Sequence, residues 1–244
     1  MRTVPEPKYQ LSLRKELKAD PSMKQDGLYD NPSSGLSAEE EAYTHILAGI
    51  RKGRYEPGDR LKAEDIASAI GLSRMPVREA LRRLSAEGLL IMRPNRGATV
   101  CTLTLADIEE IFEMRAVLEG LAVRVGTPRM NENAVDDLEN LLARMERSRH
   151  RKDAAWLAYH RQFHEYICGL SGRPRLVRQI ASLHTALEPY LRIWFVNTEM
   201  PVSANAQKEH REVIDAMRAG DPWRAESVMQ EHVHTTAPDL ARHL

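Results

Sequence analysis

The sequence of 244 residues contains little cysteine and no long hydrophobic segment, and each absence excludes a class of protein. Its two cysteines, Cys101 and Cys168, are far apart, so neither a disulfide framework nor a cysteine-based zinc site is expected. No run of about 18 apolar residues predicts a membrane-spanning helix, and no apolar segment behind a basic start predicts a secretory signal. Internal repeats and low-complexity tracts are also lacking. These absences predict a cytoplasmic protein.

The residues that are present suggest two domains with opposite charge. Apolar residues make up 42% of the sequence and charged residues 29%, which is enough apolar material for sizeable cores. The overall net charge is zero, but residues 51–103 contain eleven Lys and Arg against six Asp and Glu, a net charge of +5. Residues 104–244 contain eighteen against twenty-one, a net charge of −3. This asymmetry suggests that the first part binds a polyanion.

The N-terminal part predicts an extension followed by a small mixed domain. Residues 1–36 combine Pro, Lys, Asp, Ser and Gly with little apolar periodicity, which predicts a flexible extension with one short helix at Leu11–Lys18. Residues 37–103 predict the order helix, helix, glycine turn, helix and hairpin, which is a winged helix-turn-helix. The predicted elements are a helix from an N-cap at Ser37 to Lys52, helices Glu64–Ile70 and Ser73–Ala86, and strands Leu89–Arg93 and Ala98–Leu103.

The C-terminal part predicts only helices. Short breaks containing Pro, Gly or Asp separate six helical patterns between residues 104 and 236, and residues 237–244 are expected to form a tail. The predicted fold class is therefore mainly α, with an N-terminal winged helix-turn-helix and a C-terminal all-α helical bundle that binds a ligand. The six helices are expected at Thr104–Gly126, Asn131–His150, Asp153–Leu170, Pro174–Phe195, Ser203–Ala219 and Pro222–Thr236.

The predicted helix Ser73–Ala86 has the composition of a DNA-recognition helix. Arg74, Arg78 and Arg82 are spaced by four residues and so share one face, while apolar residues occupy the opposite face. Arginines on such a face can reach guanine edges or phosphates in the major groove, and Arg96 lies in the following hairpin, where a wing is expected. The alternative is a solvated helix face that has no partner.

The segment from Tyr55 to Val100, which includes SRMPVREAL and PNRGATV, resembles the signature of the GntR family of bacterial regulators. The resemblance implies that Arg74, Met75 and Arg78 face the bases and that Gly97, at the tip of the wing, approaches the minor groove. Some relatives place a DNA-contacting Arg in the helix before the recognition helix, and the corresponding residue here is Glu64. Members bind palindromic double-stranded operators as homodimers.

Four histidines lie on inward stripes of three predicted helices. His160 and His164 are one turn apart, and His210 and His232 each lie among apolar residues. A single histidine on such a stripe is usually an ordinary core residue. Four of them suggest a shared divalent metal, because one ion satisfies a nitrogen of every ring. Poorer candidates are His150, His184, His234 and His243.

Arg115 lies within the apolar stripe of the first predicted C-terminal helix. A buried guanidinium needs an anionic partner. The partner can be internal, for example Glu119 or Glu165, or it can be the carboxylate of a ligand that is bound by both arms of the guanidinium. The sequence leaves both interpretations open.

The C-terminal half, including FHEYICGLSGRPRLVRQI and EHREVIDAM, resembles the ligand domain of the FadR-like (FCD) branch of this family, in its metal-containing six-helix subtype. In such relatives an Asp and three His bind a divalent metal, and small organic acids bind against it. His164, His210 and His232 match the three histidines, and His160 occupies the position of the Asp. A set of four histidines favours Zn or Ni over harder cations.

The sequence thus predicts a DNA-binding regulator, expected to be a repressor, whose operator affinity is controlled by a small organic acid bound at the metal and Arg115. Three alternatives remain. The C-terminal domain could be a metal-free acyl-CoA sensor, or a metal sensor without an organic effector. A metalloenzyme is disfavoured because no general base or nucleophile accompanies the histidines.

Overall fold

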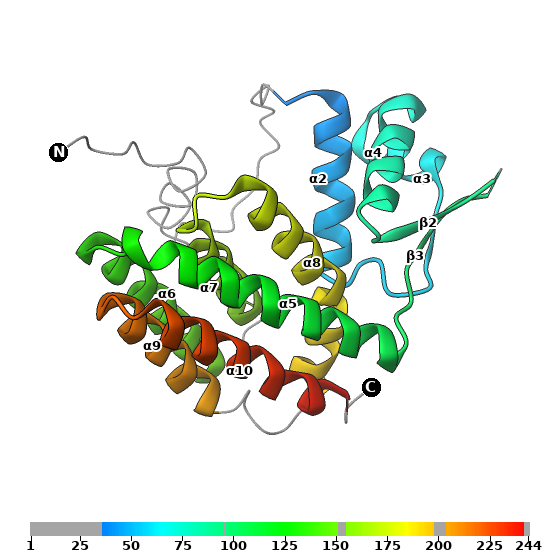
Figure 1. Cartoon of the computed structure of the whole chain (residues 1–244). Coiled ribbons are helices and arrows are strands. Elements are labelled where there is room, and N and C mark those ends of the chain that lie inside the picture. The colour runs from blue at the N-terminus through cyan, green and yellow to red at the C-terminus, as the bar shows by residue number, and fades with distance from the viewer. Residues whose placement is uncertain (1–35, 95, 151–154, 198–203, 242–244) are drawn as a thin grey trace. The chain divides into compact units, whose positions relative to one another are not determined.

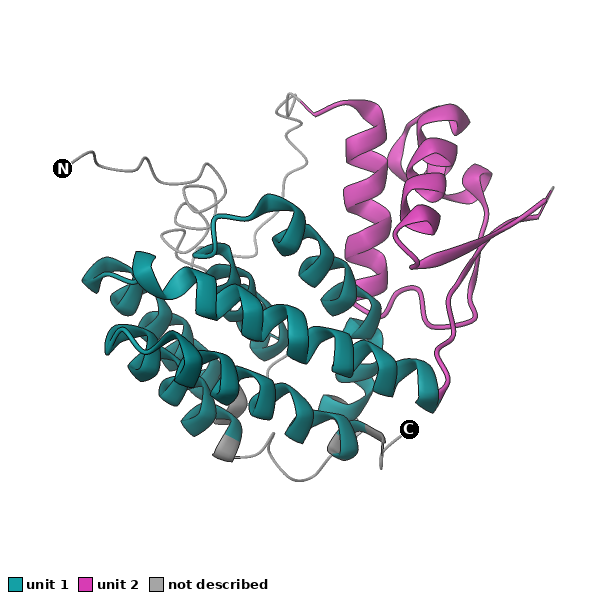
Figure 2. Cartoon of the chain, viewed as in Figure 1, with its two compact units in different colours: residues 1–22, 105–244 teal, residues 23–104 magenta. Residues whose placement is uncertain are grey.

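The computed structural model of the chain describes residues 36–94, 96–150, 155–197 and 204–241 (Figure 1). They form two compact units, which are described separately: an N-terminal unit within residues 23–104 and a C-terminal unit within residues 105–244 (Figure 2). The predicted extension over residues 1–36 lies outside the described residues except for Leu36, and the short helix expected at Leu11–Lys18 lies entirely outside them.

The N-terminal unit is a winged helix-turn-helix, as the sequence predicts. Three helices precede the β2–β3 hairpin, and a short strand before the second helix completes an antiparallel sheet in the order β1-β3-β2. The elements are α2 (Ala38–Arg51), β1 (Arg60–Leu61), α3 (Ala63–Ile70), α4 (Arg74–Ala86), β2 (Leu90–Arg93) and β3 (Gly97–Val100).

Local sequence signals explain how these helices begin and end. The Ser37 side chain accepts the backbone N–H of Glu40 at 3.2 Å, which caps α2 as expected. Gly71 ends α3 in the left-handed conformation with φ of 68°, which a glycine adopts without strain. Ser73 occupies the N-cap position of α4, but its side chain makes no capping hydrogen bond.

The apolar face of α4 anchors the recognition helix to the core of the N-terminal unit. Val77, Leu81 and Leu84 are fully or almost fully buried, and they pack with Ile46 of α2. Burial of each such side chain contributes about 1.5–3 kcal/mol. The opposite face of α4 therefore projects outward from a rigid support.

The C-terminal unit is all helical in its described residues, which confirms the mainly α fold class. Helices α5 and α10 run side by side (Figure 1). Helix α10 continues past the predicted end at Thr236, so the first residues of the expected tail are helical. The elements are α5 (Leu105–Gly126), the 3-10 turn η1 (Thr127–Arg129), α6 (Glu132–His150), α7 (Ala155–Gly169), α8 (Pro174–Asn197), α9 (Ala204–Arg218) and α10 (Pro222–Ala241).

The inward face of α5 carries charge into the centre of this bundle. Ile108, Phe112 and Ala116 are buried there together with Arg115 and Glu119, which are 3% and 0% exposed. Two buried ionised groups require hydrogen-bonding partners, so their surroundings define a polar site inside an apolar bundle. None of the described helices combines the length and apolar character that a bilayer crossing requires.

Candidate DNA-binding groove and candidate metal centre

A basic groove of about 510 Å³ lies on the N-terminal unit beside α4 and the β2–β3 hairpin. Arg74 and Arg78 of the predicted recognition helix line it, and so do Arg96 and Gly97 of the predicted wing. Two residues that the sequence did not single out, Arg60 and Lys62, extend the positive surface. The basic lining residues are Arg60, Lys62, Arg74, Arg78, Arg93 and Arg96.

Two predicted DNA-binding residues lie on the outer surface of α4 rather than in the groove lining. Met75 is 63% exposed, which is unusual for a large apolar side chain and fits a contact surface. Arg82 is exposed and forms an ion pair with Glu79. The acidic Glu64 does line the groove, and Arg74 lies 3.4 Å from its carboxylate.

The backbone at the wing explains why Gly97 is a glycine. Its φ is 82°, and a Cβ atom there would lie 2.2 Å from the carbonyl oxygen of Leu61. The Arg60 side chain also donates to the Arg96 carbonyl at 2.7 Å, which holds the turn of the wing. Close packing against β1 therefore requires glycine at this position whether or not it approaches DNA.

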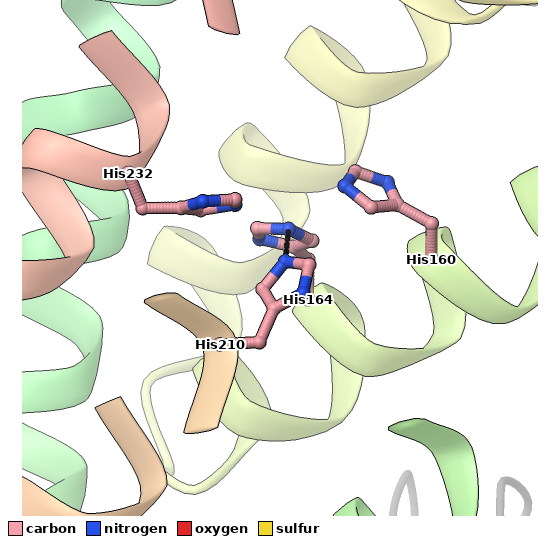
Figure 3. A group of neighbouring side chains, drawn as sticks. All are labelled: His160, His164, His210 and His232. Carbon is pink, nitrogen blue, oxygen red and sulfur yellow. Dashed lines mark hydrogen bonds between the residues drawn. The ribbon is translucent and has the colours of Figure 1, made fainter. Parts of the chain in front are cut away.

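In the C-terminal unit the four predicted histidines converge from α7, α9 and α10 (Figure 3). One nitrogen from each of His160, His164, His210 and His232 lies within 4.8 Å of the others. The Nε2 atoms of His164 and His210 are 3.3 Å apart. His164, His210 and His232 are buried, and His160 is the least buried of the four. These four residues are called the histidine ring below.

Carboxylates fix the orientation of two members of the ring. Glu119 accepts the Nδ1–H of His164 at 2.7 Å, and Glu209 accepts the Nδ1–H of His232 at 2.8 Å. A neutral imidazole that donates through Nδ1 presents the lone pair of Nε2. Hydrogen bonding of this kind is how proteins orient metal-ligating histidines.

The electrostatics keep Glu119 ionised and favour the neutral forms of His160, His164 and His210. Burial raises the pKa of the Glu119 carboxyl, but the Arg115 guanidinium and the adjacent His184 and His164 outweigh this effect and hold it well below its usual value. Burial lowers the pKa of His164 to about 3, against the opposing attraction of Glu119. Burial and neighbouring imidazoles likewise lower the pKa of His160 and His210 well below the usual range.

The histidine ring meets the chemical requirements of a divalent metal site. Two nitrogens bound to a tetrahedral zinc ion are about 3.3 Å apart, given bonds of about 2.0–2.1 Å, and the His164 and His210 nitrogens already have this separation. The buried Nδ1 of His210 has no hydrogen-bond partner among the described residues. Neutral imidazoles with available lone pairs suit Zn, Ni or Cu.

A second cluster that could hold a metal contains Glu119, His164 and His184. His184 Nε2 lies 2.9 Å from Glu119 Oε1, and Arg115 Nε donates to the same oxygen at 2.8 Å. A second dication here would face the guanidinium charge, which opposes its binding. We therefore interpret Glu119 as an acceptor that orients its three donors. The internal partner that the sequence left open for Arg115 is thus Glu119.

A cavity of about 20 Å³ lies beside the histidine ring. This volume has room for about one water molecule. His160, His232 and Arg115 line it together with aromatic rings that include Trp156. Arg115 uses Nε to bind Glu119, and no described residue hydrogen-bonds its Nη1 or Nη2 group. The indole N–H of Trp156 likewise has no hydrogen-bond partner in the described part of the chain.

Few signals in the sequence pointed to the residues that support the site. His184 was a poorer candidate on its own, yet the structure buries it against Glu119. Glu209 is adjacent to His210 in sequence, but it binds His232, which is 23 residues away. For Glu119 the available signal was its spacing of four residues from Arg115 on one helix.

A winged helix-turn-helix with a basic groove, joined to a helical bundle with a buried polar site, defines a DNA-binding transcription regulator with a sensory domain. Comparison with known proteins specifies the family. Residues 38–100 match "Bacterial regulatory proteins, gntR family", and residues 110–235 match "FCD domain". The chain belongs to the GntR family and carries an FCD domain. It is a regulator and not an enzyme, because the family and its named relatives are transcription regulators.

Two relatives match most of the chain. A "Probable D-xylose utilization operon transcriptional repressor" of Paenarthrobacter nicotinovorans is 30% identical over 196 residues, which are 80% of this chain and 85% of the relative. The "HTH-type transcriptional repressor GlaR" of Escherichia coli (strain K12) is 26% identical over 209 residues, 81% and 93% of the two chains. Both names describe repressors of transcription.

Solved structures support the fold. The structure titled "E. coli McbR/YncC" has a TM-score of 0.76 at 23% identity and covers 85% of this chain and 98% of its own. A GntR regulator from Rhodococcus sp. RHA1 has a TM-score of 0.71 at 21% identity, with coverage of 86% and 100%.

Proposed function

We propose that this protein is a repressor that binds a palindromic operator as a homodimer and releases it when a small organic acid binds beside the histidine ring. The observation that carries the sensory part is the meeting of four imidazoles with a buried guanidinium whose Nη groups have no partner among the described residues. The two named repressors among its relatives support the sign of regulation. A chromosomal operator implies that the protein acts in the cytoplasm.

Contact with DNA is assigned to Arg74, Met75, Arg78, Arg82, Arg96 and Gly97. Arginines along α4 can reach base edges and phosphates of the major groove, while the wing lies along the neighbouring backbone or minor groove. Operator affinity is expected at roughly 10⁻⁸–10⁻¹¹ M and should fall steeply as salt rises. The identical groove of a second subunit matches the second half of a palindrome.

The histidine ring would hold a divalent metal, for which Zn or Ni is preferred because all four ligands are imidazoles. When bound, such an ion can accept a carboxylate oxygen as a ligand. The Nη groups of Arg115 are positioned to hold the second oxygen, and the aromatic walls exclude water. A cavity of about 20 Å³ favours a compact acid over an acyl-CoA thioester.

DNA binding is tested by gel-shift titration of Arg78→Ala on the operator. Loss of a base contact should weaken binding by roughly 1–3 kcal/mol per half-site. Lys52→Ala is the matched control, because Lys52 is an exposed cation of the same unit outside the groove lining. Equal operator affinity of the two variants would contradict the assignment of the recognition face.

The sensory site is tested by adding a panel of small organic acids to the protein–operator complex. An active acid should release the operator from the wild type at much lower concentrations than from Arg115→Lys, which keeps a cation beside the buried Glu119 but lacks the Nη groups. Release of both proteins by the same concentrations would show that Arg115 does not bind the effector. Release by added metal alone, with no response to any acid, would instead identify a metal sensor.

A further inference from the structure

The four imidazoles of the histidine ring are not held equally. His164 and His232 are each fixed through Nδ1 by a carboxylate, and His210 is fully buried with its Nε2 against His164. By contrast, no described residue hydrogen-bonds either nitrogen of His160. The His160 imidazole instead stacks on the Trp156 indole, with their centroids 4.8 Å apart and their planes at 23° to each other. The position of His160 is therefore maintained by contacts that lack the directionality of a hydrogen bond.

His160 is also the member of the histidine ring that an incoming ligand can most readily displace. Two of the four histidines line the cavity that contains Arg115, namely His160 and His232. Glu209 anchors His232 by a hydrogen bond, whereas no described residue forms a hydrogen bond with His160. The cavity has room for about one water molecule, so a carboxylate can enter beside Arg115 only if a lining side chain moves.

We propose that His160 is an exchangeable ligand: it completes the histidine ring in the absence of effector, and the effector carboxylate takes its place between the metal and Arg115. This inference rests on the proposed function and adds the identity of the group that the effector displaces. His164, His210 and His232 remain as permanent ligands, which is the three-ligand arrangement that leaves one position open for an exogenous group.

The exchange gives the effector two favourable contacts and one cost. The carboxylate gains the metal and the Nη groups of Arg115, and it must displace one neutral imidazole. An acid too small to fill the space of the imidazole should bind weakly, because the vacated volume would stay empty or hydrated. This favours acids whose apolar part occupies the space beside Trp156.

The test uses full-length protein with His160→Ala and the matched variant His164→Ala, with zinc affinity measured by competition with a chromophoric chelator. Loss of the anchored ligand in His164→Ala should weaken zinc binding by at least about 100-fold, while His160→Ala should weaken it by less than about 10-fold. Butyrate, a carboxylate with an apolar part, is the probe of exchange. It should alter the visible spectrum of the Co²⁺-loaded wild type, and it should bind the Co²⁺-loaded His160→Ala variant more tightly, because no imidazole must leave.

The outcomes separate this inference from the proposed function. If wild type binds zinc and His160→Ala loses it as completely as His164→Ala, His160 is a permanent ligand and the inference is wrong. Weaker butyrate binding by His160→Ala than by wild type would overturn it equally. If wild type binds neither zinc nor Co²⁺, the metal site itself fails, and the inference with it. Thermal melts of the chelated proteins check that both variants fold.

Discussion

Replacing Glu119 by Gln should strongly destabilise the C-terminal unit, because this carboxylate compensates a buried charge. It accepts hydrogen bonds from Arg115, His164 and His184 at 2.7–2.9 Å and is fully buried. Glutamine has nearly the same volume, but it has a single acceptor oxygen, and its amide NH₂ would face a donor. The Arg115 guanidinium, 3% exposed, would also lose its counter-ion.

The expected cost follows from these contacts. Removal of one partner of a buried ion pair costs about 3–5 kcal/mol. For a unit of this size each kcal/mol lowers the melting temperature by about 3 °C, so a decrease of about 10–15 °C is expected. The three tryptophans, Trp156, Trp194 and Trp223, all belong to the C-terminal unit, so their fluorescence reports its unfolding selectively.

The assay is urea unfolding of the chelated protein, followed by tryptophan fluorescence. Glu113→Gln, an exposed substitution on the same helix, should change stability by less than about 0.5 kcal/mol. The double variant Arg115→Met, Glu119→Gln should recover part of the loss, because no isolated charge stays buried. A Glu119→Gln variant within about 1 kcal/mol of wild type would refute the view that this carboxylate holds the site together.

Three further predictions concern other parts of the molecule. In chelated protein the fluorescence-detected free energy of unfolding should fall below about pH 6.5. Burial lowers the pKa of His164 to about 3, so as the pH falls this histidine is protonated in the unfolded chain before it is protonated in the folded protein. The free energy of unfolding should therefore fall by about 1.4 kcal/mol per pH unit. Constant stability from about pH 6.5 to 5 would contradict this. Gly97→Ala should destabilise the N-terminal unit by roughly 1–3 kcal/mol, because φ at this position is 82° and the new Cβ would clash with the Leu61 carbonyl. An unchanged melting temperature by circular dichroism, together with unchanged operator affinity, would exclude this strain. Ser37→Ala should cost about 1 kcal/mol through loss of the cap on α2, whereas Ser37→Asp should retain most of it.

The apolar periodicity of the sequence predicted which side of each helix is buried. The spacing of the apolar residues predicted the buried face of α4, with Val77, Leu81 and Leu84 inward. The same reasoning placed His164, His210 and His232 on inward stripes, and the structure brings them together. Such predictions succeed because a helix converts sequence spacing into direction.

Contacts between segments far apart in the sequence could not be predicted from residue spacing. The bond between His184 and Glu119 joins residues 65 positions apart, and no pattern along the chain encodes it. Strand β1 has only two residues, so it shows no alternation, and it is defined by pairing with β3. The Ser73 side chain has the right residue type for a cap but makes no capping bond, because residue type permits such a bond without requiring it.

Metal analysis of the protein purified without chelators decides whether the histidine ring holds a divalent metal. We expect about one zinc or nickel ion per wild-type chain and a nearly complete loss in the double variant His164→Ala, His210→Ala. A wild-type protein with less than about 0.3 ions per chain that takes up none from a zinc solution would contradict it.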